Sequence, residues 1–365
     1  MEFGLSSDQK LLENSVRRFT EDQLPLDRIR EYAATKTGFQ AAIWKGLVDL
    51  AATGVLAPEE FGGAGFTMLD ALVIQEALGR TVAPVPFTGS AIMAPVALVT
   101  AGTAAQKEEW LPQLAAGEVK AGVGVSEIIS RRDSNGISLS SDGTLNGSAM
   151  FVIDGGPADV FLLAAGPDNM AIVPRSAPGV TVVQLTTIDY SRMHCEVKLE
   201  GVKADLLGGR DKAGEAIRKT IRAGRLALAA DTLGAAEVMV YKAVEYAKER
   251  KQFERAIGSF QAVKHMCAEM ISGLDPFRAL IWYAGHAYDA APEDSELTTL
   301  HAKSGVDDAA KFIIRTATEV HGGMGFTDLM GLHYWYKRVN VNRSLLGSPE
   351  IVRNEAAIAQ GWIAA

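Results

Sequence analysis

Two stretches in the second half of the chain decide its fold: ERKQFERAIGSFQAVKHMCAEM at residues 249–270 and EVHGGMGFTDLMGLHYWYKR at residues 319–338. Around them, apolar residues recur at helical spacing over long stretches, as at Leu226, Leu233 and Val240. Long helices joined by short connections form bundles. We therefore predict that residues 211–365 form a C-terminal four-helix bundle domain.

Two regions with different periodicity precede this bundle. Residues 1–120 carry apolar positions at helical spacing, interrupted by Pro- and Gly-rich turns, and predict an N-terminal helical domain. Ser7 is the expected N-cap of its first helix. Residues 121–210 contain short apolar runs separated by Gly, Pro and Asp, which predict a β domain, either a sheet or a small barrel. The expected fold class is therefore α+β.

Composition excludes several classes of function. The net charge of −8 argues against a nucleic-acid-binding surface. No run approaches the roughly 20 apolar residues of a membrane span. The two cysteines, Cys195 and Cys267, lie far apart and outside any CxxC pattern, so we expect neither a disulfide framework nor a metal site. A reducing cytoplasm is the expected location.

The quoted stretches also carry residue types suited to binding phosphate. Gly322, Gly323 and Gly325 follow a segment of helical periodicity and permit a close approach of the backbone to a bulky group, as a dinucleotide pyrophosphate requires. A glycine C-cap followed by a turn is the alternative. Arg250 offers a guanidinium fork that suits phosphate, although an arginine in a KER run is ordinarily a solvated residue on a helix face.

At these residues the chain resembles the acyl-CoA dehydrogenase family. The family pattern RxxFGxxIxxFQ is matched by Arg250, Phe253, Ile257, Phe260 and Gln261. Its QxxGGxGF pattern is matched by Gly322, Gly323, Gly325 and Phe326, and its EGTSxIxR pattern by Gly347, Ser348, Ile351 and Arg353. The resemblance extends through residues 50–80 and 110–118, and thus covers nearly the whole chain. It implies FAD-dependent α,β-desaturation of an acyl-CoA thioester, with an electron-transfer flavoprotein as acceptor.

The resemblance also implies which residues bind FAD: Val125, Ser126, Phe151, Ile153, Arg250, Gln252, Phe253, Phe260, Gln261, Glu319, Gly322, Gly323, Gly347 and Ser348. Phe151 takes the place of an aromatic residue near the flavin ring; a core phenylalanine is the alternative. Arg250 and Gln261 are expected to reach the ADP half of a flavin held mainly by a neighbouring subunit, which implies an oligomer. Arg225, at the expected start of a helix, would serve the acyl-CoA side, or be a surface arginine.

The expected catalytic base is missing. Desaturation needs a carboxylate that removes the α proton, and burial raises the pKa of such a group toward the working pH. Leu346 and Lys251 occupy the two positions at which we expect the family's glutamate, so we predict no catalytic residue in this chain. Glu254 is a poor substitute, and an ion pair with Arg250 at i,i+4 is its favoured interpretation.

Other departures weaken the expected cofactor site. Glu319 replaces a glutamine, Ile153 replaces a threonine, and residues 126–136 (SEIISRRDSNG) lack the family's EPGxGSD loop. Together they suggest specialisation. The segments FVIDGGPAD (residues 151–159) and FERAIGSFQAVKH (residues 253–265) resemble the bacterial branch in which two unlike subunits form a heterotetramer and only one carries the base. We therefore hypothesise that this chain is the subunit without a base, beside a homologous partner. A scaffold subunit without flavin and an oxidase-like relative are the alternatives. The sequence leaves the acyl group open, whether fatty, branched or sterol.

Overall fold

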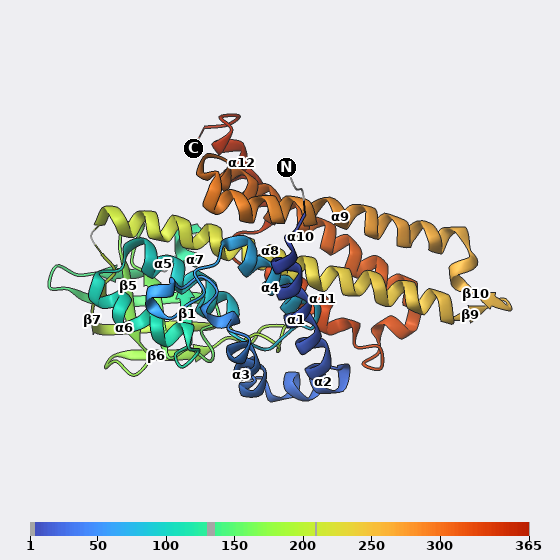
Figure 1. Cartoon of the computed structure of the whole chain (residues 1–365), viewed down its shortest axis with the longest axis horizontal. Coiled ribbons are helices and arrows are strands. Elements are labelled where there is room, and N and C mark those ends of the chain that lie inside the picture. Colours follow the sequence, from blue (N-terminus) through green and yellow to red (C-terminus); the bar gives the residue numbers. More distant parts are fainter. Residues whose placement is uncertain (1–3, 130–135, 209, 365) are drawn as a thin grey trace.

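A computed structural model describes residues 4–129, 136–208 and 210–364 of the chain (Figure 1). The N-terminal region contains the helices α1 (Ser7–Gln23), α2 (Leu26–Thr35), α3 (Ala41–Asp49), α4 (Met68–Arg80), α5 (Ala94–Ala101) and α6 (Ala104–Ala115). Short helical turns η1 (Ala52–Gly54), η2 (Glu59–Phe61) and η3 (Thr88–Met93) connect them. The N-cap of α1 is Ser6, because its Oγ accepts from the amide of Gln9 at 3.1 Å. The prediction of Ser7 was wrong by one residue.

The middle region consists of two four-stranded sheets. The first has the order β1 (Ala121–Gly124), β4 (Val160–Ala164), β5 (Met170–Pro174), β8 (Asp205–Leu206). The second has the order β2 (Ile137–Leu139), β3 (Thr144–Val152), β7 (Cys195–Lys203), β6 (Val180–Gln184). Strand β4 is buried throughout, because one face packs on the second sheet and the other on α5, α6 and α8. The short helix α7 (Ser126–Ile129) follows β1.

The C-terminal region is built on the helix α8 (Arg210–Glu249), which α9 (Gln261–Ala290) and α10 (Pro292–His321) accompany. Between α8 and α9 lie β9 (Lys251–Gln252), β10 (Arg255–Ala256) and the turn η4 (Ile257–Ser259). After α10 come η5 (Gly322–Phe326), α11 (Leu332–Ser344) and α12 (Pro349–Ala359). The predicted order of a helical, a β and a second helical region is confirmed, whereas the domain boundaries stay predictions. Arg225 lies in the middle of α8 and not at its start, because α8 begins at Arg210.

Helix α8 holds the regions together, and glycine makes its closest crossing possible. A Cβ added at Gly79 of α4 would lie 2.1 Å from the carbonyl oxygen of Asp231, and one added at Gly234 of α8 would lie 2.1 Å from that of Glu76. The two backbones therefore touch. This crossing fixes the N-terminal helices against the same helix on which the cavity described below is built.

None of the helices formed by the described residues combines the length and the hydropathy needed to span a bilayer. Within the same residues, no group of His, Cys, Asp or Glu side chains is arranged to hold a metal ion.

Candidate functional site

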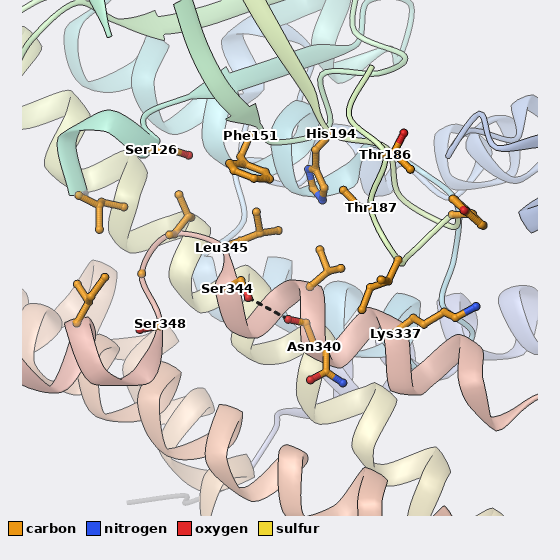
Figure 2. A pocket seen from close by; sticks show the side chains of 17 residues that line it. Ser126, Phe151, Thr186, Thr187, His194, Lys337, Asn340, Ser344, Leu345 and Ser348 are labelled. Atoms are coloured by element: carbon orange, nitrogen blue, oxygen red, sulfur yellow. Dashed lines mark hydrogen bonds between the residues drawn. The ribbon is translucent and has the colours of Figure 1, made fainter. Parts of the chain in front are cut away.

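A cavity of about 830 Å³ lies between the middle and C-terminal regions (Figure 2). Its lining consists of Ser126, Ile129, Phe151, Thr186, Thr187, Ile188, Tyr190, His194, Lys337, Asn340, Val341, Ser344, Leu345, Leu346, Gly347, Ser348 and Ile351. Six of these were singled out in the sequence: Leu346, the motif residue Ile351 and the predicted flavin-binding residues Ser126, Phe151, Gly347 and Ser348. The structure thus brings part of the predicted site together from elements more than 200 residues apart.

A β-bulge directs Phe151 into the cavity. The pairing of β3 with β7 shifts between Ala149 and Val152, so that the strand carries one extra residue there. Phe151 adopts a φ of 50°, which is unusual for a large side chain. Glu127 of α7 accepts from the amide of Met150 at 2.7 Å and ties α7 to the bulge. The ring of Phe151 therefore forms part of the wall rather than of the sheet core (Figure 2).

The opposite wall is the loop between α11 and α12, where the missing base was expected. Leu346 has a φ of 55° and is only 3% exposed. Its side chain packs against α8 at Gly224, where an added Cβ would lie 2.5 Å from Leu346 Cδ1 and 2.9 Å from Met93. Arg225 Nε donates to the carbonyl oxygen of Leu346 at 2.8 Å and fixes the loop. An apolar side chain thus fills this part of the cavity wall.

Arg225 is buried and already paired. Its Nη1 and Nη2 donate to the two carboxylate oxygens of Glu355 in α12 at 2.6 and 2.9 Å. The alternative of a surface arginine is wrong, since the residue is 4% exposed. This bidentate geometry is the strongest that an arginine and a carboxylate can form. Arg225 therefore anchors α12 to α8, immediately behind the loop that carries Leu346 and Gly347.

The lining of the cavity contains no carboxylate among the residues that the structure describes. Its titratable side chains are Tyr190, His194 and Lys337. His194 was not anticipated from the sequence, where it stands in the apolar run MHCEVKL and suggested only a strand. A polar residue inside such a run was the one available signal. Residues 130–135 of the departing loop lie outside the described part of the chain.

Two predicted flavin-binding residues lie beside the cavity but not in its lining. Val125 is 1% exposed and packs with the helices that cover the first sheet. Ile153 is 0% exposed, and its amide and carbonyl pair with those of Val123 at 2.9 and 3.0 Å. Both side chains therefore belong to the core, next to the start of α7 that carries Ser126 and to the end of β3 that carries Phe151.

The remaining predicted residues gather at the opposite end of the C-terminal region (Figure 1). Arg250 and Gln261 are exposed on either side of the β9–β10 hairpin, and Glu319, Gly322 and Gly323 are exposed where α10 ends. Tyr246 of α8 stacks on His321 of α10 with ring centroids 4.5 Å apart, which brings the two helix ends together. Gly322 has a φ of 57° and is the C-cap of α10, so the alternative of a glycine C-cap is confirmed, whereas its contact with phosphate stays a prediction.

The β9–β10 hairpin changes what was expected of Glu254 and of Lys251. Phe253 and Glu254 occupy its two turn positions with φ values of 52° and 61°. Glu254 is thus not helical, and no ion pair joins it to Arg250 within the described residues. Lys251 and Gln252 are exposed in β9, and Lys251 does not line the cavity. Phe260 stacks edge-on against Phe253 with centroids 6.2 Å apart.

The two groups of predicted residues are far apart within one chain. Along α8, Arg225 lies about 36 Å from Glu249, the residue before Arg250, at 1.5 Å per residue. A single FAD molecule cannot reach both. The cavity fits a flat aromatic ring, because it offers the ring of Phe151, hydroxyl groups from Ser126 and Ser348, and an imidazole. The distant group fits phosphate, with an exposed guanidinium and uncrowded glycine backbone.

Family models for the N-terminal and C-terminal domains of acyl-CoA dehydrogenases match residues 6–118 and 214–360, which together make up most of the chain. The chain belongs to the acyl-CoA dehydrogenase family. The predicted family and fold are thereby confirmed.

Similar acyl-CoA dehydrogenase family members extend over nearly the full length of the chain. Acryloyl-CoA reductase (NADH) of Anaerotignum propionicum is 26% identical, and the match covers 96% of this chain and 94% of that protein. Acyl-CoA dehydrogenase IpdE2 of Mycolicibacterium smegmatis is 27% identical, over 97% of this chain and 100% of that protein. Among solved structures, the ChsE4–ChsE5 complex from Mycobacterium tuberculosis matches with a TM-score of 0.91, 25% identity and coverage of 100% of both chains.

Proposed function

We propose that this chain is the subunit without a base in a heteromeric, FAD-dependent acyl-CoA dehydrogenase, whose homologous partner carries the glutamate. The observation that carries the proposal is the loop between α11 and α12. Leu346 there is buried against Gly224 and Met93, and no carboxylate lines the cavity within the described residues. Neither a leucine nor any other side chain of this wall can remove an α proton at neutral pH as a carboxylate does.

Family membership supports FAD as the cofactor. When bound, FAD supplies the ring that accepts the hydride from the β carbon of the acyl group. Phe151 would stack beside that ring, and Ser126 and Ser348 would hydrogen-bond around it. Arg225 would act indirectly, because its pairing with Glu355 holds the loop of Gly347 in place. We infer an electron-transfer flavoprotein as the acceptor and a cytoplasmic location.

The separation of the two groups of predicted residues supports an oligomer. Arg250 and Gly322 lie too far from the cavity of their own chain to serve the same flavin, so we infer that they serve a cavity in another subunit. Around them the large apolar side chains Phe253, Phe326 and Leu329 are 86%, 82% and 69% exposed. Exposed apolar groups gathered in this way are typical of a protein–protein interface.

The test is to purify the chain alone and together with a homologous subunit that carries glutamate at the position of Leu346. We expect the chain alone to lack acyl-CoA dehydrogenase activity and the complex to be active and yellow. The flavin-to-chain ratio, the activity with an electron-transfer flavoprotein and the formation of peroxide are measured on both. The matched control is the complex in which the partner's glutamate is replaced by leucine, which should bind flavin without activity.

Three results would contradict the proposal. Full flavin content and dehydrogenase activity of the chain alone would mean that it needs no partner. A colourless chain whose complex binds no more flavin than the partner does alone would favour the scaffold alternative, because such a subunit carries no cofactor. Peroxide formed in place of electron transfer to the flavoprotein would favour the oxidase-like alternative. The same assay with short, branched and sterol acyl-CoA substrates would identify the acyl group.

A further inference from the structure

His194 lines the cavity but has no role in the proposed binding of flavin by Phe151, Ser126 and Ser348. It stands directly before β7, and its backbone is held by the amide of Leu185, which donates to the His194 carbonyl oxygen at 3.0 Å. Its imidazole points into the cavity beside Phe151 (Figure 2). The residue is nevertheless 0% exposed in the chain. A ligand in the cavity therefore reaches the ring nitrogens only when the side chains that cover them shift.

The ring has unused hydrogen-bonding capacity. Neither Nδ1 nor Nε2 has a hydrogen-bond partner in the described part of the chain. The carbonyl of Val152 is near enough to favour protonation weakly, but no hydrogen bond of ordinary geometry forms. Burial, together with the charge of Arg192, lowers the pKa of His194 to about 3. The imidazole is then neutral, with one N–H donor and one nitrogen acceptor.

Buried polar groups without partners are rare and destabilising, so a pair of them facing a cavity indicates a ligand. The surroundings define the chemistry of that ligand. Phe151 offers an aromatic face, Leu345 and Val341 offer apolar contact from the other wall, and no carboxylate lines the described cavity to select a cation. A flat, uncharged ring with a carbonyl at its edge suits these walls and would accept a hydrogen bond from the imidazole.

We propose that His194 donates a hydrogen bond to a carbonyl of the flavin ring and thereby influences its reduction potential. The inference rests on the proposed function. The histidine N–H would donate to a ring carbonyl, whereas the other imidazole nitrogen points away from that edge and takes no part in the contact. Donation to a carbonyl stabilises the electron density that the ring gains on reduction. Loss of this bond therefore makes the potential of the bound flavin more negative.

The amide groups of an acyl-CoA could in principle satisfy the same imidazole, so the test uses separate probes. The preparation that carries flavin, alone or in complex, is stripped of cofactor and titrated with FAD, with lumiflavin, which is the ring alone, and with butyryl-CoA. His194→Phe removes both hydrogen-bonding atoms and keeps an aromatic ring. His194→Gln keeps a donor and an acceptor. His301→Gln changes an exposed histidine of α10 and is the matched control.

We expect His194→Phe to weaken FAD and lumiflavin binding about ten-fold, which corresponds to the loss of one neutral hydrogen bond. The potential should become more negative, and His194→Gln should restore both quantities toward those of the unmodified chain. Thermal unfolding of each variant shows whether it folds. If His194→Phe folds and binds lumiflavin like the unmodified chain, or loses only butyryl-CoA binding, the inference is wrong. If the unmodified protein binds no flavin in any preparation, the proposed function itself fails and the inference with it.

Discussion

Replacing Arg338 by methionine should weaken the contacts between the three regions of the molecule and lower its stability. Arg338 of α11 is 0% exposed. Its Nε donates to Asp189 of the β6–β7 loop at 2.7 Å and its Nη1 to Asp231 of α8 at 3.2 Å. Its Nη2 donates to Ser191 Oγ at 2.7 Å and to the carbonyl of Val82 at 3.1 Å, which belongs to the N-terminal region. One guanidinium thus joins the N-terminal, middle and C-terminal regions.

The size of the effect follows from what the substitution leaves behind. Asp231 and Asp189 would stay buried with only part of their partners, and removing one member of a buried ion network costs about 3–5 kcal/mol. At roughly 2 °C per kcal/mol for a chain of this length, the first unfolding transition should fall by about 8 °C. The control is Arg353→Met, whose ion pair with Asp308 is exposed and should change the transition by less than about 2 °C.

The pH dependence gives a second check on Arg338→Met. Burial alone would raise the pKa of Asp231, but the charges of Arg338 and Arg192 hold it below its ordinary value. A carboxyl whose pKa is lower in the folded state stabilises that state at pH values above its unfolded pKa of about 3.9. This stability is lost as the pH falls through the folded pKa. Without Arg338 the pKa of Asp231 rises, so the deficit should shrink from pH 7 to pH 4. A transition within about 2 °C of the unmodified protein at pH 7, measured by calorimetry, would refute the reasoning.

Two further predictions test the packing and the assembly. Gly79→Ala places a Cβ 2.1 Å from the carbonyl oxygen of Asp231 and should cost about 3 kcal/mol in denaturant unfolding, whereas Gly273→Ala in α9 has open space and should be neutral or stabilising. Equal effects at the two glycines would contradict the α4–α8 crossing. Phe253→Ser should leave the unfolding of the isolated chain unchanged and weaken its association with the partner at least ten-fold; unchanged association in sedimentation would exclude the hairpin from the interface.

The fold was predictable because its signals are local. Helical spacing and short apolar runs change along the chain at the places where the regions change, and each depends on neighbouring residues only. The β9–β10 hairpin was missed for the opposite reason. Its turn residues Phe253 and Glu254 adopt left-handed φ values of 52° and 61° that usually require Gly or Asn, so their residue types give no turn signal. The run ERKQFERA therefore resembled a continued helix.

The site was predictable only where a motif coincides with the cavity. Ser126, Phe151, Gly347 and Ser348 lie in it, whereas Val125 and Ile153, one residue from Ser126 and two from Phe151, are in the core. Pairing between distant segments gave no sequence signal: Arg225 meets Glu355 across 130 positions. His194 likewise acquires its role from burial and from the absence of a partner in the folded chain, neither of which its neighbours in sequence reveal.

The cavity is asymmetric, and this asymmetry connects the missing base with the proposed role. The wall from the middle region keeps groups that suit a flat ring: the Phe151 face, the Ser126 hydroxyl and the His194 imidazole. The loop between α11 and α12 forms the other wall. It is held in place by the packing of Leu346 on α8 and by the pairing of Arg225 with Glu355. A glutamate at Leu346 alone would place a carboxylate in the buried apolar cluster that Leu346 shares with Met93. Conversion of this subunit into a base-carrying one therefore requires changes on α8 and α12 as well as in the loop.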